Sequence, residues 1–253
     1  MPCLSSIYQW LPVKNLTAGV NNHDFYNKIK VRVSTLDHEA RQCILIFDEI
    51  SIKKDLKYNQ HHNKVDGFVD YGEGEIIDNR QNIIAKSICV FMIRSLFGSF
   101  KQVLSYVVVE KSTSPANLKY LVEANLDICT ELGLDIKVTV CDQGPTNQSL
   151  YRLLGTNEKK PYFYFRKSKI YALFNVPHIF NNIRNNLMKY KLSISDCDTK
   201  VNWDVIKELF LLDTSSKARV CPRLKPEHIN PNNFQRMNVR LAVQILSKST
   251  TVF

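Results

Sequence analysis

The chain has 253 residues, of which 44% are hydrophobic and 23% charged, as expected for a globular protein with one large or two smaller domains. No apolar run of about 18 residues is present, so we expect no membrane span. Residues 1–5 lack the features of a signal peptide, so we expect no secretion. The net charge of +10 favours a polyanionic partner, with nucleic acid preferred over membrane. A basic protein whose charges are merely solvated is the alternative.

The seven cysteines are scattered along the chain, and none forms a CxxC pair. Several lie inside apolar segments, which predicts buried, reduced thiols rather than disulfides or a zinc site. The expected compartment is therefore the nucleus or the cytosol.

The first 40 residues read as a helical lead-in, with short helices expected at 4–13 and 25–33. Residues 41–174 follow as a region of strands and helices. Its expected strands, which are rich in apolar and β-branched residues, are 43–47, 65–71, 88–97, 103–109, 136–141 and 170–174.

Two helices are expected between the later strands of this region. The first has Ser114 as its N-cap, Pro115 at its first position and Gly133 as its stop, and the second covers 145–153. Consecutive strands followed by alternating helices and strands predict a mixed sheet with antiparallel and parallel parts. This order fits a ribonuclease-H-like α/β fold, in which the first strand and the strand after the first helix lie side by side.

The last region, residues 175–253, is expected to be mostly helical. Helices are expected at 178–190 and 201–212, followed by a proline-containing loop at 221–231. One last helix is expected around residues 234–245.

Two aspartates stand at the ends of the strands that this fold brings together. Asp48 follows the apolar run 43–47, and Asp142 follows the strand 136–141. Carboxylate oxygens from adjacent strands suit Mg²⁺ or Mn²⁺, and metal-assisted phosphodiester chemistry needs such a pair. The alternatives are a strand-end carboxylate that accepts loop N–H groups for Asp48, and turn chemistry for Asp142.

Residues 159–195 contain eight bases and no acid, with aromatic residues interleaved. Bases can neutralise phosphates and aromatic rings can stack on unpaired bases, so the stretch is a candidate nucleic-acid surface. The alternative is that the aromatics form core and the bases are solvated. The helix that follows residues 176–178 carries four amides and Arg184, which could contact a nucleotide. Neither common phosphate-loop motif is present.

Several short motifs resemble, in this order, those of P-element-type transposases, which include the THAP-domain transposases. They are IFDEISI (46–52), DGFVD (66–70), KQ (101–102), VCDQG (140–144), VPH (176–178), IRNN (183–186) and MNVRLA (237–242). The resemblance implies a ribonuclease-H-like catalytic domain interrupted by a GTP-binding insertion domain. It implies that Asp48 and Asp142 are the first two acids of a DDE/DDD-type Mg²⁺ (or Mn²⁺) site.

The resemblance also implies a function in the nucleus, where the family cuts and rejoins transposon DNA by in-line attack of water or a 3′-hydroxyl. It allows a homo-oligomer in a full-length context. The residues expected to contact nucleic acid are Lys101, Arg166, Lys167, Lys169 and Arg184.

Three departures from the family pattern shape the prediction. The family's third acid follows the insertion domain, within which this chain ends, and the THAP module and coiled coil are absent. Asn175 and Asn181 stand where the family has the Asp and Lys of its guanine-nucleotide motif, although His178 persists, which puts GTP binding in doubt.

We therefore expect a transposase fragment that cleaves DNA weakly or not at all by itself. The alternatives are a catalytically inactive nucleic-acid-binding or interaction protein derived from a transposase, and a pseudogene product without function.

Overall fold

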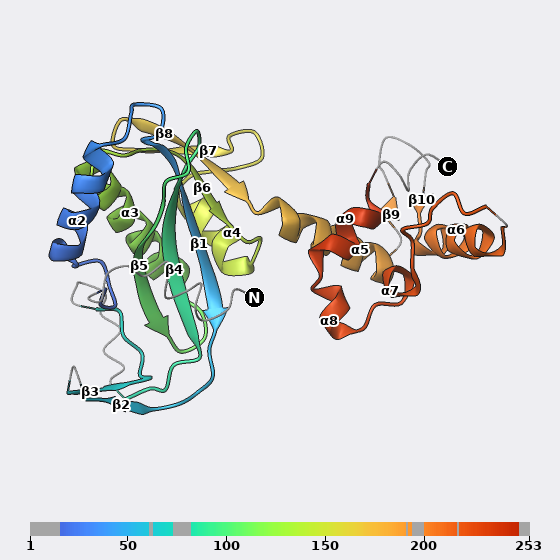
Figure 1. The fold of residues 1–253 in the computed structure, drawn as a ribbon, viewed down its shortest axis with the longest axis horizontal. Helices are drawn as coiled ribbons and strands as arrows, with labels where there is room; N and C mark the ends of the chain where they lie inside the picture. Colours follow the sequence, from blue (N-terminus) through green and yellow to red (C-terminus); the bar gives the residue numbers. More distant parts are fainter. Residues whose placement is uncertain are drawn as a thin grey trace. The chain divides into compact units, whose positions relative to one another are not determined.

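The computed structural model describes residues 16–60, 63–72, 82–190, 192–193, 200–216 and 218–247. It divides into two compact units, Met1–Leu173 and Phe174–Phe253 (Figure 1). The helix expected at residues 4–13 lies outside the described residues. No described helix is both long enough and apolar enough to cross a membrane.

A six-stranded mixed sheet forms the centre of the first unit. Its spatial order is β5-β4-β1-β6-β8-β7. β1 pairs antiparallel with β4 and parallel with β6, while β4 with β5 and β7 with β8 are antiparallel pairs. The strands are β1 (Gln42–Ser51), β4 (Ser87–Ser95), β5 (Lys101–Val109), β6 (Asp135–Cys141), β7 (Tyr162–Phe165) and β8 (Ser168–Phe174). The mixed sheet and the adjacency of β1 and β6 confirm the expected fold class, whereas β7 was not predicted.

Helices α3 (Pro115–Glu131) and α4 (Pro145–Leu153) lie behind the sheet in Figure 1 and pack against each other. The expected N-cap is confirmed, because the Ser114 side chain accepts a hydrogen bond from the Asn117 N–H. The expected stop is also present, since Gly133 has a φ of +79°. Helix α2 (His23–Ser34) confirms the helix expected at residues 25–33.

The two faces of the sheet differ in burial. Along β1, Cys43, Leu45 and Phe47 are buried, while the residues between them are only half-buried. We call the second face the open face of the sheet. Asp48 lies on it, because side chains alternate along a strand.

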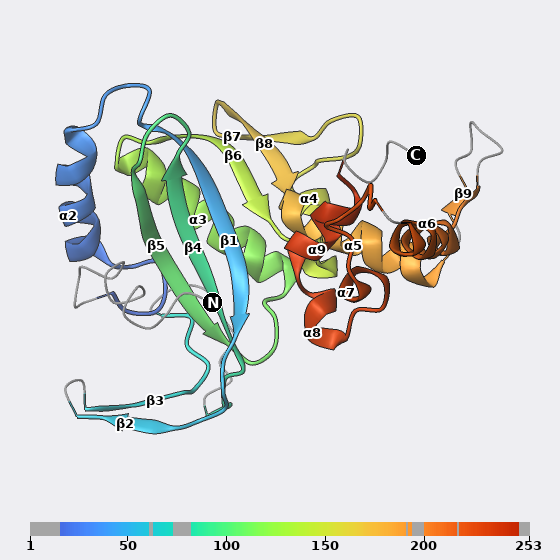
Figure 2. The same ribbon diagram turned by 45° about the vertical axis from the view of Figure 1, so that its right-hand side comes forward.

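The strand expected at residues 65–71 is wrong. Only β3 (Lys64–Asp66) forms there, and it pairs with β2 (Lys57–Asn59) in a small ribbon separate from the central sheet (Figures 1 and 2). The chain turns at Gly67, which has a φ of +115° and packs so close to Asp55 that a Cβ atom would lie 2.1 Å from its carbonyl oxygen. Beyond this turn, Phe68 and Asp70 form isolated β-bridges with Ile84 and with Val108 of β5.

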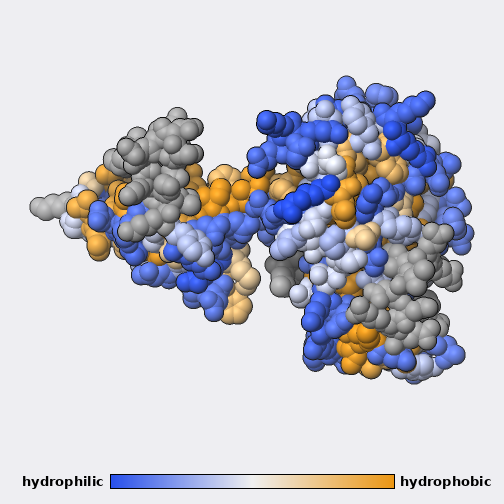
Figure 3. Space-filling model, turned by 180° about the vertical axis from the view of Figure 1, so that it is seen from behind, coloured by the Kyte–Doolittle hydropathy of each residue, from blue (hydrophilic) through white to orange (hydrophobic). Residues whose placement is uncertain are grey.

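The second unit is mostly helical around a small core that includes Leu187, Trp203 and Ile245. The helices expected at 178–190 and 201–212 are confirmed. The elements are α5 (Val176–Lys189), β9 (Leu192–Ser193), β10 (Lys200–Val201), α6 (Trp203–Ser215), α7 (Pro226–Ile229), α8 (Asn233–Arg236) and α9 (Val239–Ile245). Apolar surface on this unit is visible in Figure 3. Among its large hydrophobic side chains, Leu212 and Phe234 are 70% and 83% exposed.

The single helix expected around residues 234–245 is wrong, because α8 and α9 are separate. Asn238 causes the break: its side chain accepts a hydrogen bond from the Arg240 N–H and so begins a new helix.

The five described cysteines are all buried and free, as expected. Cys3 and Cys197 lie outside the described residues.

Candidate active site

Asp48 and Asp142 extend from neighbouring parallel strands at the same level. Ile46 of β1 pairs with Val140 of β6; Asp48 lies two residues further along β1, and Asp142 lies two residues past Val140, just beyond the end of β6. Two residues are one full side-chain repeat of a strand, so the register directs both carboxylates towards the open face. Asp48 is exposed, and its Oδ1 accepts a hydrogen bond of 2.8 Å from the Glu49 N–H.

Asp142 forms the turn that connects β6 to α4. Its Oδ1 accepts hydrogen bonds from the Gly144 N–H, at 3.0 Å, and from the Asn147 side-chain amide. The alternative of turn chemistry is therefore correct for this oxygen. Within the described residues Oδ2 makes no hydrogen bond or ion pair, so turn chemistry leaves one oxygen of Asp142 for another ligand.

Gly144 determines how closely the chain approaches this carboxylate. A Cβ atom at position 144 would lie 3.0 Å from Asp142 Oδ1, closer than ordinary contact. Gly144 is also the N-cap of α4, and Pro145 begins the helix. The sequence Asp-Gln-Gly-Pro thus fixes the orientation of the carboxylate at a helix start.

Both carboxylates affect the same buried groups. Burial raises the pKa of the Cys141 thiol to about 12, and the negative charges of Asp142 and Asp48 contribute to that shift. The pKa of Glu49 is also raised, first by burial and then by the charges of Asp142 and Asp48. The same two charges act on both groups, in agreement with the register of β1 and β6, which brings Asp48 and Asp142 to the same end of the sheet.

Glu49 is a neighbour of the site that the sequence reasoning did not include. Its Oε1 accepts a hydrogen bond of 2.9 Å from the Thr113 N–H, which connects the end of β1 to the start of α3. Alternation along β1 puts Glu49 on the opposite face from Asp48. The only signal in the sequence was its position next to Asp48.

Divalent metal ions fit this pair of carboxylates in ligand chemistry but not in ligand number. Asp48 and Asp142 offer hard oxygen donors, one of them with an unengaged oxygen. Among the described residues there is no group of three or more His, Cys, Asp or Glu side chains that could hold a metal ion. Two is therefore the largest number of ligands of these four residue types that the described part of the chain supplies here.

The five bases expected to contact nucleic acid do not form one surface. Lys101 is exposed at the start of β5, where it pairs with Arg94. Arg94 in turn pairs with Ile44, which is four residues before Asp48. This separation is about 13 Å along the strand. Lys101 therefore lies away from the two aspartates.

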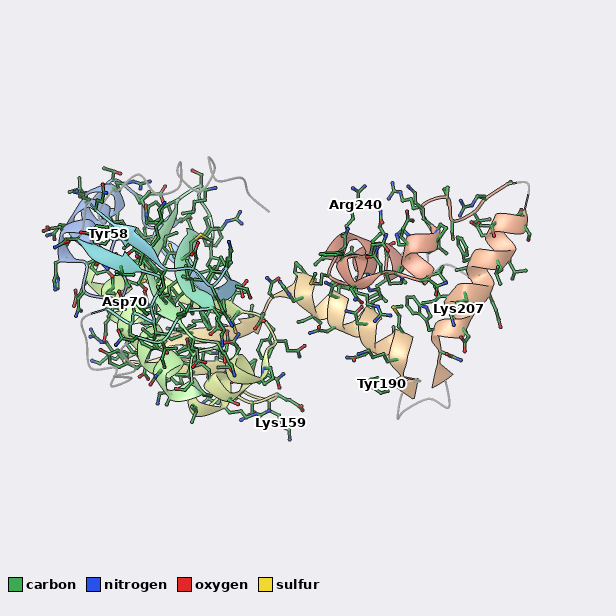
Figure 4. The ribbon with its side chains drawn as sticks, turned by 90° about the horizontal axis from the view of Figure 1, so that it is seen from below. Tyr58, Asp70, Lys159, Tyr190, Lys207 and Arg240 are labelled. Atoms are coloured by element: carbon green, nitrogen blue, oxygen red, sulfur yellow. The ribbon has the colours of Figure 1, made fainter. Side chains whose placement is uncertain are left out.

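Arg166 and Lys167 form the turn between β7 and β8, and both are exposed. Arg166 has a φ of +52° and forms an ion pair with Asp127 of α3. Lys169 lies on β8 next to tyrosine rings, and Lys159 projects outwards just before β7 (Figure 4).

Arg184 is a correction to the sequence interpretation. It is fully buried, and its guanidinium donates hydrogen bonds to the carbonyls of Gln235 and Arg236 and to Asn181 Oδ1. Burial lowers the pKa of Arg184, and the nearby charge of Arg236 lowers it further. A side chain whose donors hold the end of α8 is not available to a nucleic acid.

Asn175, His178 and Asn181, the positions that match the family's guanine-nucleotide motif, differ in exposure and in hydrogen bonding. Asn181 is 8% exposed, and its amide donates to the Met237 carbonyl at 3.0 Å, so it holds the link between α8 and α9. This engagement agrees with the doubt about GTP binding that the replacement of the family's Lys by Asn181 raised. Asn175 is the N-cap of α5 without a side-chain capping bond, and His178 is exposed on the first turn.

Comparisons with known proteins match both parts of the chain. Residues 17–155 match the family described as TNP-like, RNase H N-terminal domain, and residues 177–252 match the TNP-like, GTP-binding insertion domain. The Transposable element P transposase of Drosophila melanogaster is 22% identical over 99% of this chain and 30% of its own length. DNA transposase THAP9 of Homo sapiens is 22% identical over 98% of this chain and 28% of its own length.

One solved structure shares the fold. The Drosophila P element transposase strand transfer complex superposes with a TM-score of 0.73 and 22% identity, over 99% of this chain and 51% of that one. Of the Drosophila and human relatives, in contrast, the chain spans less than a third of the length.

Proposed function

From the premise that this chain belongs to the TNP-like, P-element-type transposase family, we propose that it carries the first part of a DNA transposase active site. Asp48 and Asp142 would be two carboxylates of that site. The observation that carries the proposal is the register of β1 and β6, in which both aspartates follow the pair Ile46 and Val140 by two residues.

The proposed chemistry is cleavage and transfer of phosphodiester bonds in DNA. Asp48 and Asp142 would hold Mg²⁺ or Mn²⁺, which supplies charge stabilisation and an activated oxygen nucleophile when bound. The chain's own contribution is to orient the carboxylates: the Gly144 N–H and Asn147 fix Asp142, and the rigid β1 strand fixes Asp48.

Two carboxylates are enough to bind a metal ion weakly, but the family's reaction uses three acids. Because no three-residue metal cluster occurs among the described residues, we expect at most weak cleavage of transposon-end DNA by the purified chain. Cleavage that depends on Mg²⁺ and is abolished by Asp48→Ala would contradict this expectation. A DNA substrate also favours the nucleus as the site of action, and the family resemblance allows a homo-oligomer in a full-length context.

Calorimetric titration with Mn²⁺ tests the site itself. The chain should bind Mn²⁺ weakly, and Asp48→Asn or Asp142→Asn should each abolish that binding. Asp24→Asn is a matched control, because it removes the same charge from α2. Equal Mn²⁺ affinity in all four proteins would refute the metal site.

A nucleic-acid-binding protein without catalysis is the second candidate function. It is supported by the exposed lysines and tyrosines of the β7–β8 hairpin, which do not depend on the acid pair. DNA binding that survives Asp48→Asn and Asp142→Asn, in a chain that binds no metal, would favour it.

GTP binding would be weak or absent in this chain. Asn175 lacks the carboxylate that can accept two hydrogen bonds from guanine, and Asn181 is engaged with Met237. A fluorescent GTP analogue should therefore not bind measurably, and Asn175→Asp should increase its affinity. Tight binding to the unaltered chain that Asn175→Ala leaves unchanged would contradict this assignment.

A further inference from the structure

The hairpin of β7 and β8 exposes aromatic side chains on one of its two faces. Phe163 and Ile170 pair across the strands and are each 2% exposed, so one face is core. Tyr164 and Tyr171 point to the other face and are 61% and 42% exposed. Large aromatic rings are therefore held at the surface by strands whose opposite face is fixed in the core.

Lysine ammonium groups lie over these rings. Lys169 Nζ is 3.9 Å from the ring centroid of Tyr162 and 4.8 Å from that of Tyr171. Lys160 Nζ is 5.6 Å from Tyr162 and 6.0 Å from Tyr164. A hydrogen bond with the Tyr171 hydroxyl raises the pKa of Lys169, which keeps its cationic form. We call Lys160, Tyr162, Tyr164, Lys169 and Tyr171 the tyrosine–lysine face.

The net charge around this face is strongly positive. Residues 159–171 include five bases and no acid. Arg166 pairs with Asp127 of α3 and is thus turned away from the face, but the two lysines over the rings form no ion pair with an acid in the described residues. A polyanion therefore has both charge and flat apolar surface to bind here.

A purely structural role does not account for this arrangement. Cross-strand pairs such as Tyr162 with Tyr171 stabilise a hairpin by about 0.2–1 kcal/mol, and both rings contribute to that. Tyr164 pairs with Lys169 and contacts Tyr162 edge to face at 5.8 Å, yet most of its ring stays exposed. The exposed ring area is surface that hairpin stability does not use.

The tyrosine–lysine face lies on the open face of the sheet, as do the two aspartates. Ile170 lines a groove with Leu126 of α3 and Ile136 of β6, so its side of β8 is the helix-covered one. Tyr171 alternates to the opposite side.

The tyrosine–lysine face is also close to the aspartates along the strands. β8 neighbours β6 in the sheet, and the Tyr171 carbonyl lies 3.4 Å from Thr139 Oγ1. Thr139 is three residues before Asp142, which is about 10 Å along the strand. A strand of nucleic acid bound at the hairpin can therefore reach the acid pair without leaving this side of the sheet.

We propose that the tyrosine–lysine face binds unpaired nucleotides of a single-stranded DNA segment, whose bases stack on Tyr164 and Tyr171 and whose phosphates contact Lys160 and Lys169. Exposed rings recognise bases only where these are unstacked, which selects single strands over intact duplex. The choice of DNA rests on the proposed function, because it comes from the neighbouring aspartates. The choice of a single-stranded polyanion rests on the hairpin alone.

Fluorescence anisotropy with a labelled oligothymidylate of about 12 nucleotides tests the proposal. Tyr164→Ala should weaken binding roughly 5- to 100-fold, since one ring stacks on one base, and Tyr164→Phe should stay within about twofold of the unaltered chain. Lys169→Gln should reduce the slope of log K against log salt concentration by about 0.7, for one phosphate contact on a single strand.

Matched controls separate this surface from other exposed residues. Tyr58, which is 56% exposed on β2, supplies Tyr58→Ala, and Lys30 on α2 supplies Lys30→Gln. Both should leave affinity and salt slope unchanged. Asp48→Asn should also leave oligothymidylate binding intact, so loss of the metal site and loss of the hairpin site give different results.

Four outcomes would overturn the proposal. If Tyr164→Ala binds with unchanged affinity, no base stacks on the Tyr164 ring. If Tyr164→Phe binds as weakly as Tyr164→Ala, the contact is made by the hydroxyl instead of the ring. Equal affinity for duplex of the same length would make the surface a general phosphate binder. Oligouridylate bound at least tenfold more tightly than oligothymidylate would identify RNA as the partner and contradict the choice of DNA.

Discussion

Replacing Arg184 with alanine is expected to destabilise the second unit by about 3 kcal/mol. The guanidinium is fully buried, and it holds the carbonyls at the end of α8 as well as Asn181 Oδ1, at 3.1 Å. No carboxylate among the described residues forms a salt bridge with it. Its stabilising contribution therefore comes from hydrogen bonds to neutral acceptors.

The magnitude follows from two opposing effects. The bonds to Asn181 Oδ1 and to the Arg236 carbonyl contribute about 1.5–3 kcal/mol each. Those to the half-buried Asn185 Oδ1, at 3.2 Å, and to the Gln235 carbonyl, at 3.5 Å, add less. Removing the guanidinium also removes the free energy needed to bury it, which offsets part of the loss. The Arg236 carbonyl keeps a bond of 3.3 Å from the Asn185 amide, so it is not left without a donor.

Urea unfolding followed by the fluorescence of Trp203 measures this loss directly. Trp203 is buried in the core of the second unit, and a Trp10→Phe background makes it the only tryptophan. A loss of 3 kcal/mol corresponds to a fall of roughly 12–24 °C in the melting temperature of a unit of this size. Arg240→Ala is the control, because Arg240 is exposed on α9 (Figure 4).

The reasoning fails if Arg184→Ala stays within about 0.5 kcal/mol of the unaltered chain, the usual range of surface substitutions. It also fails if stability is unchanged while DNA affinity falls. That second result would restore the nucleic-acid contact that the sequence suggested for Arg184.

Three further predictions concern other parts of the chain. Gly144→Ala should weaken Mn²⁺ binding without unfolding the first unit, since its Cβ atom would lie 3.0 Å from Asp142 Oδ1; calorimetry together with circular dichroism checks this. Burial raises the pKa of Glu49, so the stability that it contributes is present below the ordinary glutamate pKa and lost as pH rises through the folded-state pKa. Glu49→Gln should remove that loss in urea midpoints measured from about pH 4 to about pH 7. Hydrogen bonds, first from the Cys221 N–H, lower the pKa of Asp213, so its contribution is present above the ordinary aspartate pKa and lost as pH falls through the folded-state pKa. Asp213→Asn should therefore melt lower at neutral pH and show a smaller further loss in acid.

The central sheet was predictable because its signals are local. A continuous apolar run marks β1, β-branched residues in alternation with polar ones mark β6, and the Ser-Pro and Gly signals mark the ends of α3. The order of these elements along the chain then limits the topology, so the adjacency of Asp48 and Asp142 follows from the sequence alone.

The errors arise where contacts distant in sequence decide the conformation. Residues 65–71 alternate like a strand, but the chain turns at Gly67, and its two sides pair with different segments: β3 with β2, and Asp70 with Val108 of β5. Strand β7 consists of four aromatic residues, whose two faces cannot be distinguished by hydropathy alone. The burial of Arg184 depends on carbonyls about 50 residues further along the chain.

Anomalous diffraction from crystals of the chain soaked in Mn²⁺ tests the central claim most directly. The account predicts an anomalous peak between the carboxylates of Asp48 and Asp142, lost in crystals of Asp142→Asn. A peak elsewhere, or well-ordered aspartates without a peak at a Mn²⁺ concentration that saturates binding in solution, would contradict it.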